Sequence, residues 1–373
     1  MKTAMRAAVL TTAMGLVLAA CAAAPEEQPA NTSAPGATAT AEAVAYTACM
    51  VSDEGGFDDA SFNQSGYEGL TRARDELAIE IKDAESTDPG QYVTNVDSMV
   101  QENCDLIIGV GFALEDAIQA AAEANPDISF ALVDSSFSDA DFNPVTIDNA
   151  KPLLFNTQEA AFLAGYLAAG VTQTGTVATY GGMPYPSVTI FMDGFSDGIA
   201  RYNEDNGTTV ALLGWDKEAQ NGSMIGNFSD TEAGRTTTEQ FIASGADVIL
   251  PVAGPVGAGS LNAASQSDGV SVIWVDSDGY LQPANADYKG LILTSVMKLI
   301  GNSVFDTIAA AVEGSFTSDP YVGTLENGGV DMAPLHDFEA TAAPDLVAAV
   351  EDLKQQIISG ELVIESPSAN VTK

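Results

Sequence analysis

The chain has 373 residues, more than one hydrophobic core usually serves, so we expect two domains. Hydrophobic residues make up 46% of the chain and charged residues 17%, a composition that excludes a wholly disordered protein. With 52 acidic and 13 basic residues the net charge is −39. This charge argues against nucleic-acid binding and against docking on anionic lipid through a basic patch.

Residues 1–21 show a targeting pattern. Lys2 and Arg6 precede an apolar run of about 14 residues, which suits a signal peptide and is too short to span a bilayer. The run ends at residues 18–21, Leu-Ala-Ala-Cys, which resembles the bacterial lipobox, in which the cysteine becomes the lipidated first residue. We expect a lipid anchor at Cys21 and a place on the extracytoplasmic face of the cell membrane. The alternative is ordinary secretion with Cys21 incidental.

Residues 22–43 differ from the rest of the chain in composition. They are rich in Ala, Pro, Thr and Glu and contain almost no large apolar side chain. Because such a segment cannot bury a core, it is predicted to be a flexible tether.

Two further cysteines, Cys49 and Cys104, lie at or near predicted strands. The expected compartment is oxidising, so a disulfide is feasible if those strands are parallel neighbours. The alternative is two buried thiols. Their spacing fits no zinc-binding pattern.

The region after residue 43 alternates predicted strands with predicted helices. Apolar strands are expected at 44–51, 78–81, 105–110, 130–133 and 145–147. Helices are expected at 61–77, 92–102 and 115–124. Apolar strands separated by amphipathic helices are typical of a parallel, doubly wound sheet.

The same alternation then starts again. Strands are expected at 176–180, 210–213, 248–252, 272–275 and 291–294. Helices are expected at 158–171, 188–203, 232–244, 260–267 and 301–312. Two α/β units indicate two similar lobes. Ligands of such sheets bind outside the carboxyl ends of the strands, so we expect a ligand cleft between the lobes.

Polar or glycine-rich loops follow many of the predicted strands. They begin at Asp53, Gly109, Asp134, Gly181, Ala253 and Asp276. If the sheets are parallel, these loops meet at one edge of each sheet and line the cleft with carboxylates and exposed backbone.

The clearest sign of catalysis is at residues 194–198, Gly-Phe-Ser-Asp-Gly, which match the G-x-S-x-G pattern of hydrolases. Asp276 and His336 follow in the order that this class uses. The motif requires a strand directly before the serine, whereas the apolar residues around Ser196 have helical spacing. We therefore set the hydrolase aside and expect no enzyme.

Other cofactor and metal patterns are weak. The sequence contains no phosphate-binding G-x-x-x-x-G-K-[ST] motif. Residues 254–259 are glycine-rich and form either a surface for close ligand approach or a tight strand-to-helix turn. Asp53, Asp58 and Asp59 do not fit the spacing of a calcium loop. We expect neither a cofactor nor a metal.

Several segments together resemble one known family. The most specific is residues 53–64, which read D-x-G-G-x-x-D-x-S-F-N-Q. Others are residues 109–112, 130–134, 159–165, 194–195, 226–230, 245–247, 275–276 and 294–298. In this order they resemble the basic membrane protein family of bacterial lipoproteins, the substrate-binding proteins of ABC importers whose characterised members bind nucleosides. Tyr185, Met297 and the high acidity depart from that family's pattern.

The resemblance implies the type I periplasmic-binding-protein fold, with two doubly wound parallel-sheet lobes, a hinge and a cleft. Lobe one would contain residues 44–150 and 278–312. Lobe two would contain residues 151–277 and 313–373.

The resemblance also implies a set of ligand-binding residues for the base. Phe62 and Phe228 would stack on its two faces, which suits a flat, neutral ring. Asp53 and Asn63 would line the pocket, and Asp134 would accept hydrogen bonds from the base edge. The alternatives are core packing for the two rings and helix capping for Asp134.

The sugar would be held by a second group. Gly254, Asp276 and Lys298 would bind the ribose, because vicinal hydroxyls suit a carboxylate acceptor beside an ammonium donor. The alternative for Lys298 is an exposed surface lysine.

These expectations give a monomeric lipoprotein that binds a nucleoside, a purine nucleoside foremost, and delivers it to an ABC permease in the membrane. The alternative is the same fold binding a sugar or another small polar solute.

Overall fold

The structure is a computed structural model that describes residues 44–139 and 143–369. The predicted signal peptide, the predicted lipidation site at Cys21 and the predicted tether lie outside the described residues. Among the helices described, none is long and apolar enough to cross a membrane.

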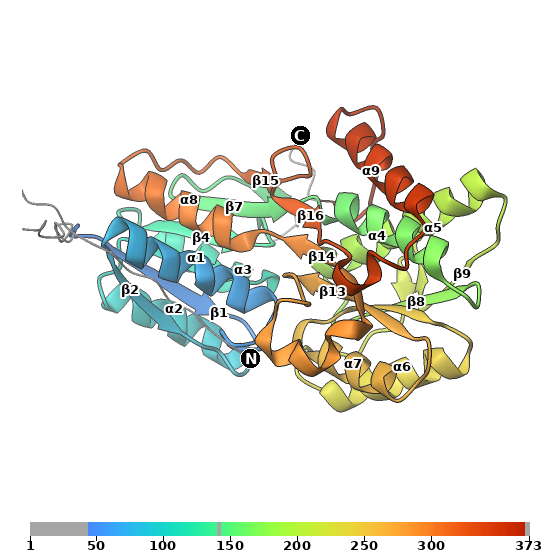
Figure 1. The fold of residues 1–373 in the computed structure, drawn as a ribbon. Coiled ribbons are helices and arrows are strands. Elements are labelled where there is room, and N and C mark those ends of the chain that lie inside the picture. The colour runs from blue at the N-terminus through green and yellow to red at the C-terminus, as the bar shows by residue number, and fades with distance from the viewer. Residues whose placement is uncertain (1–43, 140–142, 370–373) are drawn as a thin grey trace, which may run out of the picture. The chain divides into compact units, whose positions relative to one another are not determined.

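Six strands form the first sheet, in the order β15-β7-β4-β3-β1-β2 (Figure 1). They are β1 (Thr47–Ser52), β2 (Glu80–Ala84), β3 (Leu106–Val110), β4 (Ser129–Val133), β7 (Ala150–Phe155) and β15 (Tyr321–Gly323). Every neighbouring pair is parallel. β3 is buried along its whole length because helices cover both faces of the sheet.

Alternation along β1 divides the side chains between two cores. Ala48 and Met50 pack on the face covered by α1 (Phe62–Leu77) and α8 (Ile300–Val312). Cys49 and Val51 pack on the face covered by α2 (Tyr92–Gln101) and α3 (Glu115–Ala124). Successive side chains of a strand point to opposite faces, so one short apolar segment contributes to both cores.

Cys49 and Cys104 form a disulfide with a Cα–Cα distance of 6.0 Å. Cys49 lies within β1, and Cys104 precedes β3, which pairs with β1 in parallel. The parallel pairing that the sequence named as the condition for this bond is therefore present.

The second sheet also has six strands, in the order β16-β14-β13-β12-β8-β9. They are β8 (Thr176–Gly181), β9 (Ala211–Leu213), β12 (Val248–Val252), β13 (Ser271–Asp276), β14 (Ile292–Lys298) and β16 (Val330–Met332). Only β16, at the edge, pairs antiparallel in this sheet.

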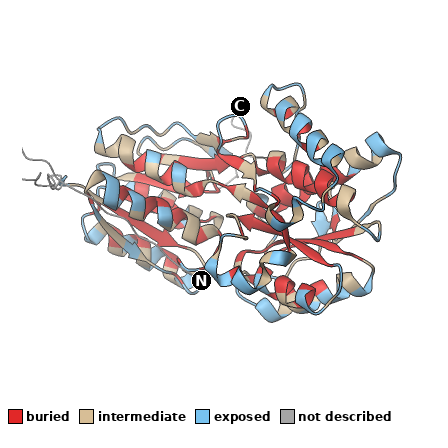
Figure 2. Cartoon of the chain, in the orientation of Figure 1, coloured by how far each residue is buried: buried red, intermediate tan, exposed pale blue. Residues whose placement is uncertain are grey.

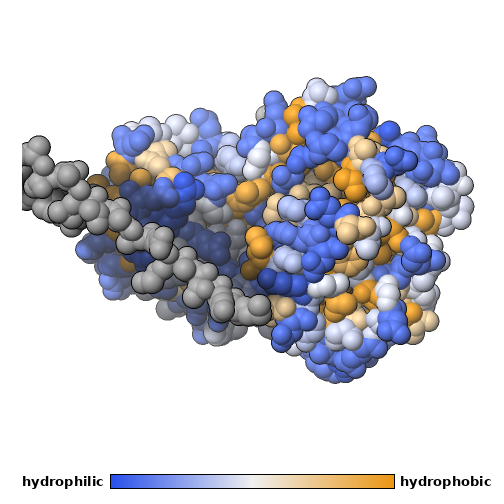
Figure 3. Space-filling model, viewed as in Figure 1, coloured by the Kyte–Doolittle hydropathy of each residue, from blue (hydrophilic) through white to orange (hydrophobic). Residues whose placement is uncertain are grey.

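Helices cover both faces of the second sheet as well. One face packs against α4 (Thr157–Val171) and α5 (Pro186–Asn206), with α9 (Pro344–Ile358) beside α4. The other packs against α6 (Thr231–Ala243) and α7 (Gly257–Ser265). In Figure 2 the buried residues follow the two sheets and the helix faces turned toward them. The visible surface in Figure 3 is mostly hydrophilic, with small, separate apolar patches.

We call the first sheet with its helices the first lobe and the second sheet with its helices the second lobe. The fold is the two-lobed, parallel-sheet α/β architecture of type I periplasmic binding proteins. The chain passes from the first lobe to the second after Phe155, returns after Lys298, and passes again between Gly323 and Val330.

The expected lobe boundaries differ from these crossings. Residues 278–312 were expected in lobe one, but β14 pairs with β13 in the second sheet, and of the regular elements in that range only α8 belongs to the first lobe. Residues 313–373 were expected in lobe two, but β15 pairs with β7 in the first sheet. The third crossing follows β15, a strand of three residues that is too short to give a clear sequence pattern.

The glycines of the G-x-S-x-G pattern serve helix packing. A Cβ at Gly194 would lie 2.3 Å from the carbonyl oxygen of Gln158, and one at Gly198 would lie 2.0 Å from that of Phe162. Both carbonyls belong to α4, so the backbones of α4 and α5 touch where these glycines lie. Ser196 lies inside α5, as its helical spacing predicted, and not on a strand-to-helix turn.

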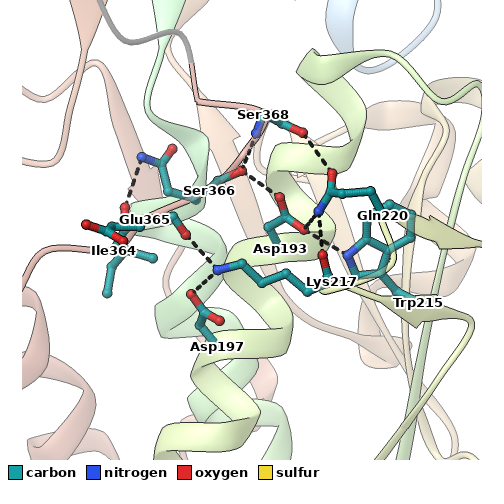
Figure 4. Close-up of polar contacts among 10 residues, drawn as sticks. Asp193, Asp197, Trp215, Lys217, Gln220, Ile364, Glu365, Ser366 and Ser368 are labelled. Carbon is teal, nitrogen blue, oxygen red and sulfur yellow. Dashed lines mark hydrogen bonds and ion pairs between the residues drawn. The ribbon is translucent and has the colours of Figure 1, made fainter.

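The segment after α9 is bound to the second lobe by a polar network around one buried carboxylate (Figure 4). Asp193 of α5 is fully buried and accepts hydrogen bonds from Trp215 Nε1 (2.9 Å), Gln220 Nε2 (2.9 Å) and Ser366 Oγ (2.6 Å). Nearby, Lys217 Nζ pairs with Asp197 at 2.6 Å. One buried carboxylate thus joins three segments that are distant in sequence.

We predict that Asp193→Ala lowers the free energy of unfolding by roughly 3 kcal/mol, because it leaves the buried indole N–H of Trp215, and the less buried donors of Gln220 and Ser366, without their charged acceptor. Asp197→Ala is the matched control: its ion pair is partly exposed, so its cost is about 0–1 kcal/mol. Urea denaturation of both variants measures the difference. Equal losses would contradict the assignment of Asp193 as the centre of the network.

Candidate functional site

A cavity that is partly open to solvent lies at the carboxyl ends of strands from both sheets. Asp53 follows β1 and Asp134 follows β4 in the first sheet. Asp276 ends β13 and Lys298 ends β14 in the second. This is where parallel topology places a ligand, because the loops after the strands converge there.

The cavity is lined by each of the eight residues that the sequence assigned to ligand binding. They are Asp53, Phe62, Asn63, Asp134, Phe228, Gly254, Asp276 and Lys298. The structure therefore brings together residues spread over most of the folded chain.

Lys298 is the charged centre of the cavity wall. Its side chain is 3% exposed and its ammonium pairs with Asp134 of the first lobe and with Asp276 of the second, at 3.5 Å. Burial lowers the pKa of Lys298, but the two carboxylates more than offset this effect and hold its pKa above the usual value. The group is thus a buried ammonium ion shared by both lobes, not a surface lysine.

Both carboxylates are held in an unusual backbone conformation. Asp134 has φ of 67° and Asp276 has φ of 68°, in the left-handed region that non-glycine residues rarely adopt. Ser61 Oγ donates to Asp276 Oδ2 at 2.8 Å. No helix begins at Asp134, so it is not a helix cap. Such strained positions concentrate at functional sites, where the surrounding structure holds them in place.

A second polar group lies at the start of α1. Asn63 Nδ2 donates to Asp53 Oδ1 at 3.0 Å. Asp59, which the sequence did not place in the site, also lines the cavity and caps α1 by accepting from the backbone N–H groups of Ser61, Asn63 and Gln64 at 2.9–3.0 Å. Within residues 44–139 and 143–369, no cluster of His, Cys, Asp and Glu side chains could hold a metal ion.

Two observations define what this polar group can bind. Asn63 Oδ1 is buried, and within the described part of the chain no group donates a hydrogen bond to it. Burial raises the pKa of Asp53 to about 8, because the carboxyl borders the cavity but is otherwise surrounded by protein and by other acids. Near neutral pH the pair therefore offers one free acceptor, Asn63 Oδ1, beside a neutral carboxyl that can donate.

The aromatic side of the cavity comes from both lobes. Phe62 begins α1, and the ammonium of Lys298 lies 4.5 Å from its ring centroid. Phe228 packs against the backbone of Gly182, where a Cβ would lie 2.3 Å from its ring. Phe112, the last residue of the resembling segment 109–112, lines the cavity, and so does Tyr185, which the sequence marked only as a departure from the family.

Gly254 lines the cavity at a turn that only glycine adopts readily. Its φ is 53°, and it begins the short 3₁₀ turn Gly254–Val256 between β12 and α7. Of the two uses the sequence left open, the tight turn is therefore present. The turn also brings bare backbone to the cavity wall.

The hydrolase residues do not assemble. His336 pairs through Nε2 with Asp278 at 2.8 Å and stacks on Tyr280, and Asp276 pairs with Lys298. Ser196 lies inside α5. None of Ser196, Asp278 and His336 lines the cavity.

Comparison with known proteins gives one consistent result. A family model described as "ABC transporter substrate-binding protein PnrA-like" matches residues 46–367. The ABC transporter nucleoside-binding protein BmpA of Lactococcus lactis subsp. cremoris is 31% identical over 86% of this chain and 89% of its own length. Basic membrane protein A of Borreliella burgdorferi is 31% identical over 86% of this chain and 88% of its own.

Solved structures agree in fold. A solute-binding protein of an ABC transporter system from Aeropyrum pernix superposes with a TM-score of 0.77 at 25% sequence identity. The match covers 87% of this chain and 94% of that one.

We predict that Lys298→Met lowers the free energy of unfolding by about 3–5 kcal/mol, because two buried carboxylates lose their counter-ion. Lys82→Met is the control, since the Lys82–Glu102 pair is partly exposed and contributes about 0–1 kcal/mol. Urea denaturation without added ligand tests this. A loss at Lys298 no larger than that at Lys82 would be inconsistent with a buried ion group.

We predict that Asp53 makes the protein less stable as the pH rises. The pKa of Asp53 is about 8 in the folded chain, above its ordinary value of 3.8, so between pH 6.5 and 8 the folded state retains a proton that the unfolded state has lost. Stability then falls by up to about 1.4 kcal/mol per pH unit and levels off above pH 8. Asp53→Asn removes this dependence, and unfolding free energies at pH 6.5 and 8 measure it. An unchanged slope in Asp53→Asn would show that the carboxyl is ionised throughout. The pKa of Asp59, raised by burial to about 6, lies below this window.

Proposed function

The chain belongs to the family of PnrA-like ABC transporter substrate-binding proteins, and we propose that it binds nucleosides, purine nucleosides foremost, in this cavity and delivers them to a membrane permease. The observation that carries the proposal is the joint lining of one cavity by two aromatic rings and a buried ammonium–carboxylate group. The relative from Lactococcus lactis, named as nucleoside-binding, supports the same ligand class.

The aromatic rings suit a flat base. Phe62 belongs to the first lobe and Phe228 follows β11 (Asn221–Gly222) in the second, so a base held between them contacts both lobes. Stacking on two faces is favourable for a neutral heteroaromatic ring and tolerates several bases.

The polar groups suit the rest of the nucleoside. The free acceptor Asn63 Oδ1 needs a donor such as a ring N–H or an exocyclic amino group, and the Asp53 carboxyl can serve an adjacent acceptor. A hydrogen-bond donor for Asn63 and an acceptor for Asp53 occur side by side on the edge of a purine base. Asp276 and Lys298, which line the same cavity, would share the ribose hydroxyls, and the backbone of Gly254 would lie close to them.

The charge of the cavity sets a further limit on the ligand. Besides the neutral carboxyl of Asp53, its acidic residues are Glu54, Asp59, Asp134 and Asp276, and Lys298 is the only basic residue that lines it. A phosphate would meet this negative field and find the single ammonium already paired. The proposed ligand is therefore an uncharged nucleoside and not a nucleotide.

Binding between two lobes provides the transport signal. A ligand that contacts both lobes stabilises their closed arrangement through contacts made only in that state. The three crossings between lobes are the proposed hinge. Backbone hydrogen bonds tie them together, from Asn156 N to Gly323 O at 2.8 Å and from Leu299 N to Gly329 O at 2.9 Å. The closed form is the one that the permease would recognise.

The proposed setting follows from the N-terminal pattern. A lipid on Cys21 and a tether over residues 22–43 would hold the folded body at the extracytoplasmic face of the membrane. The Cys49–Cys104 disulfide suits that oxidising compartment. We propose that the protein acts as a monomer, without a cofactor and without catalysis.

We predict that adenosine, inosine and guanosine bind the full chain in calorimetric titration, that sugars such as ribose and galactose bind far more weakly, and that AMP does not bind.

Phe228→Ala weakens nucleoside binding by roughly 1–3 kcal/mol through the lost stack. Phe305→Ala is the control, because that ring packs under the Arg72 guanidinium and does not line the cavity.

Two results would overturn the proposal. Tight binding of a sugar without nucleoside binding would assign the cavity to the sugar-binding alternative. An unchanged affinity in Phe228→Ala would remove that ring from the site.

A further inference from the structure

Two aromatic side chains meet across the cleft. Phe112 follows β3 in the first lobe, and Tyr185 directly precedes α5 in the second. Their rings are stacked, with centroids 5.0 Å apart and an angle of 24° between the planes. Both line the cavity. This contact joins the lobes directly, from protein to protein.

Tyr185 also contacts the ring that is proposed to hold the ligand. Its centroid lies 6.0 Å from that of Phe228, at an angle of 31°. Phe228 in turn packs against the bare backbone of Gly182. Phe112, Tyr185 and Phe228 therefore form a continuous aromatic row from the first lobe to the second, with Tyr185 in the middle.

The Tyr185 side chain lies near acidic side chains of the first lobe. Burial and the nearby carboxylates of Asp53 and Glu54 raise the pKa of Tyr185, so the side chain is a neutral phenol at physiological pH. A neutral ring of this kind stacks on another ring without bringing a charge into the cleft.

We propose that Tyr185 is a positioning residue for ligand binding: by stacking on Phe112 it holds the two lobes closed over the cavity, and by contacting Phe228 it fixes the orientation of the ligand-stacking ring. A contact made only between closed lobes raises the closed fraction of the protein. The apparent affinity for any ligand of the closed form rises by the same factor. The closure itself does not depend on the ligand's identity; only the role of Phe228 rests on the proposed function.

The chain contains its own reporter of closure. Trp274 of β13 donates through Nε1 to the carbonyl oxygen of Ala60 in the first lobe at 3.3 Å, and its side chain is 1% exposed. When the lobes separate, this hydrogen bond breaks and the indole N–H is exposed to water. The only other tryptophan, Trp215, is bonded to Asp193 within the second lobe, so its signal stays constant.

The first experiment measures tryptophan emission and acrylamide quenching of the full chain without added nucleoside. Tyr185→Ala and Phe112→Ala should each shift the emission to the red and increase quenching. Tyr185→Phe keeps the ring and should restore the original spectrum, whereas Tyr185→Leu, apolar but without a ring, should behave like Tyr185→Ala. Phe305→Ala controls for the loss of a ring elsewhere in the first lobe. Unchanged emission in the Tyr185 and Phe112 variants would overturn the proposal.

The second experiment is a double-mutant cycle on adenosine affinity. Each alanine variant should bind roughly two- to tenfold more weakly, and the double variant should bind no more weakly than the weaker single one, because both changes remove the same contact. Losses that multiply in the double variant would mean that each ring acts on the ligand independently and would overturn the proposal.

If no nucleoside binds but the emission shifts as expected, the closure contact stands and the nucleoside assignment fails. Circular dichroism of each variant confirms that it is folded.

Discussion

The structure depends on one buried ammonium ion held between two carboxylates. Lys298 lies where β14 ends and the chain returns to the first lobe, and it pairs with Asp134 from one sheet and Asp276 from the other. Such a group is expensive to desolvate, and burial alone would favour its neutral form. Its partners keep it charged, so the two lobes are joined electrostatically at the floor of the cleft.

The other residues that line the cavity surround this ion group. Strands β1 and β12 end at the same edges of the two sheets, and the segments that follow them bring Asp53, Phe62 and Gly254 to the same cavity. The ammonium lies against the face of Phe62, which favours a cation near the ring and orients both groups. A site of this composition has flat apolar surfaces for a base and densely placed acceptors for hydroxyls and N–H groups. These are the features on which the nucleoside proposal rests.

Much of this arrangement was predictable because it follows from periodicity and topology. The alternation of apolar strands and amphipathic helices predicts the two-lobed fold. The polar residues directly after the strands predict much of the cavity lining. The sequence did not predict β7, because Lys151 and Pro152 interrupt its apolar run, or α9, whose burial is limited to one narrow face. It also could not give the contact of Tyr185 with Phe112, since that pairing depends on how the two lobes meet. The orphaned oxygen of Asn63 likewise depends on neighbours that only the fold assembles.

The glycines of α5 link the packing of α4 against α5 to the shape of the cavity. Gly194 and Gly198 let α5 lie backbone to backbone on α4, and the first turn of α5 adjoins Tyr185. Any side chain added at either glycine would push the helix axis outward and move its amino-terminal end with it. These two glycines are also the ones that match the G-x-S-x-G pattern of serine hydrolases. In this chain their role is to let the backbones of α4 and α5 approach closely. Substitutions at these two positions, neither of which lines the cavity, would therefore change the shape of the binding site without altering the identity of any residue that lines it.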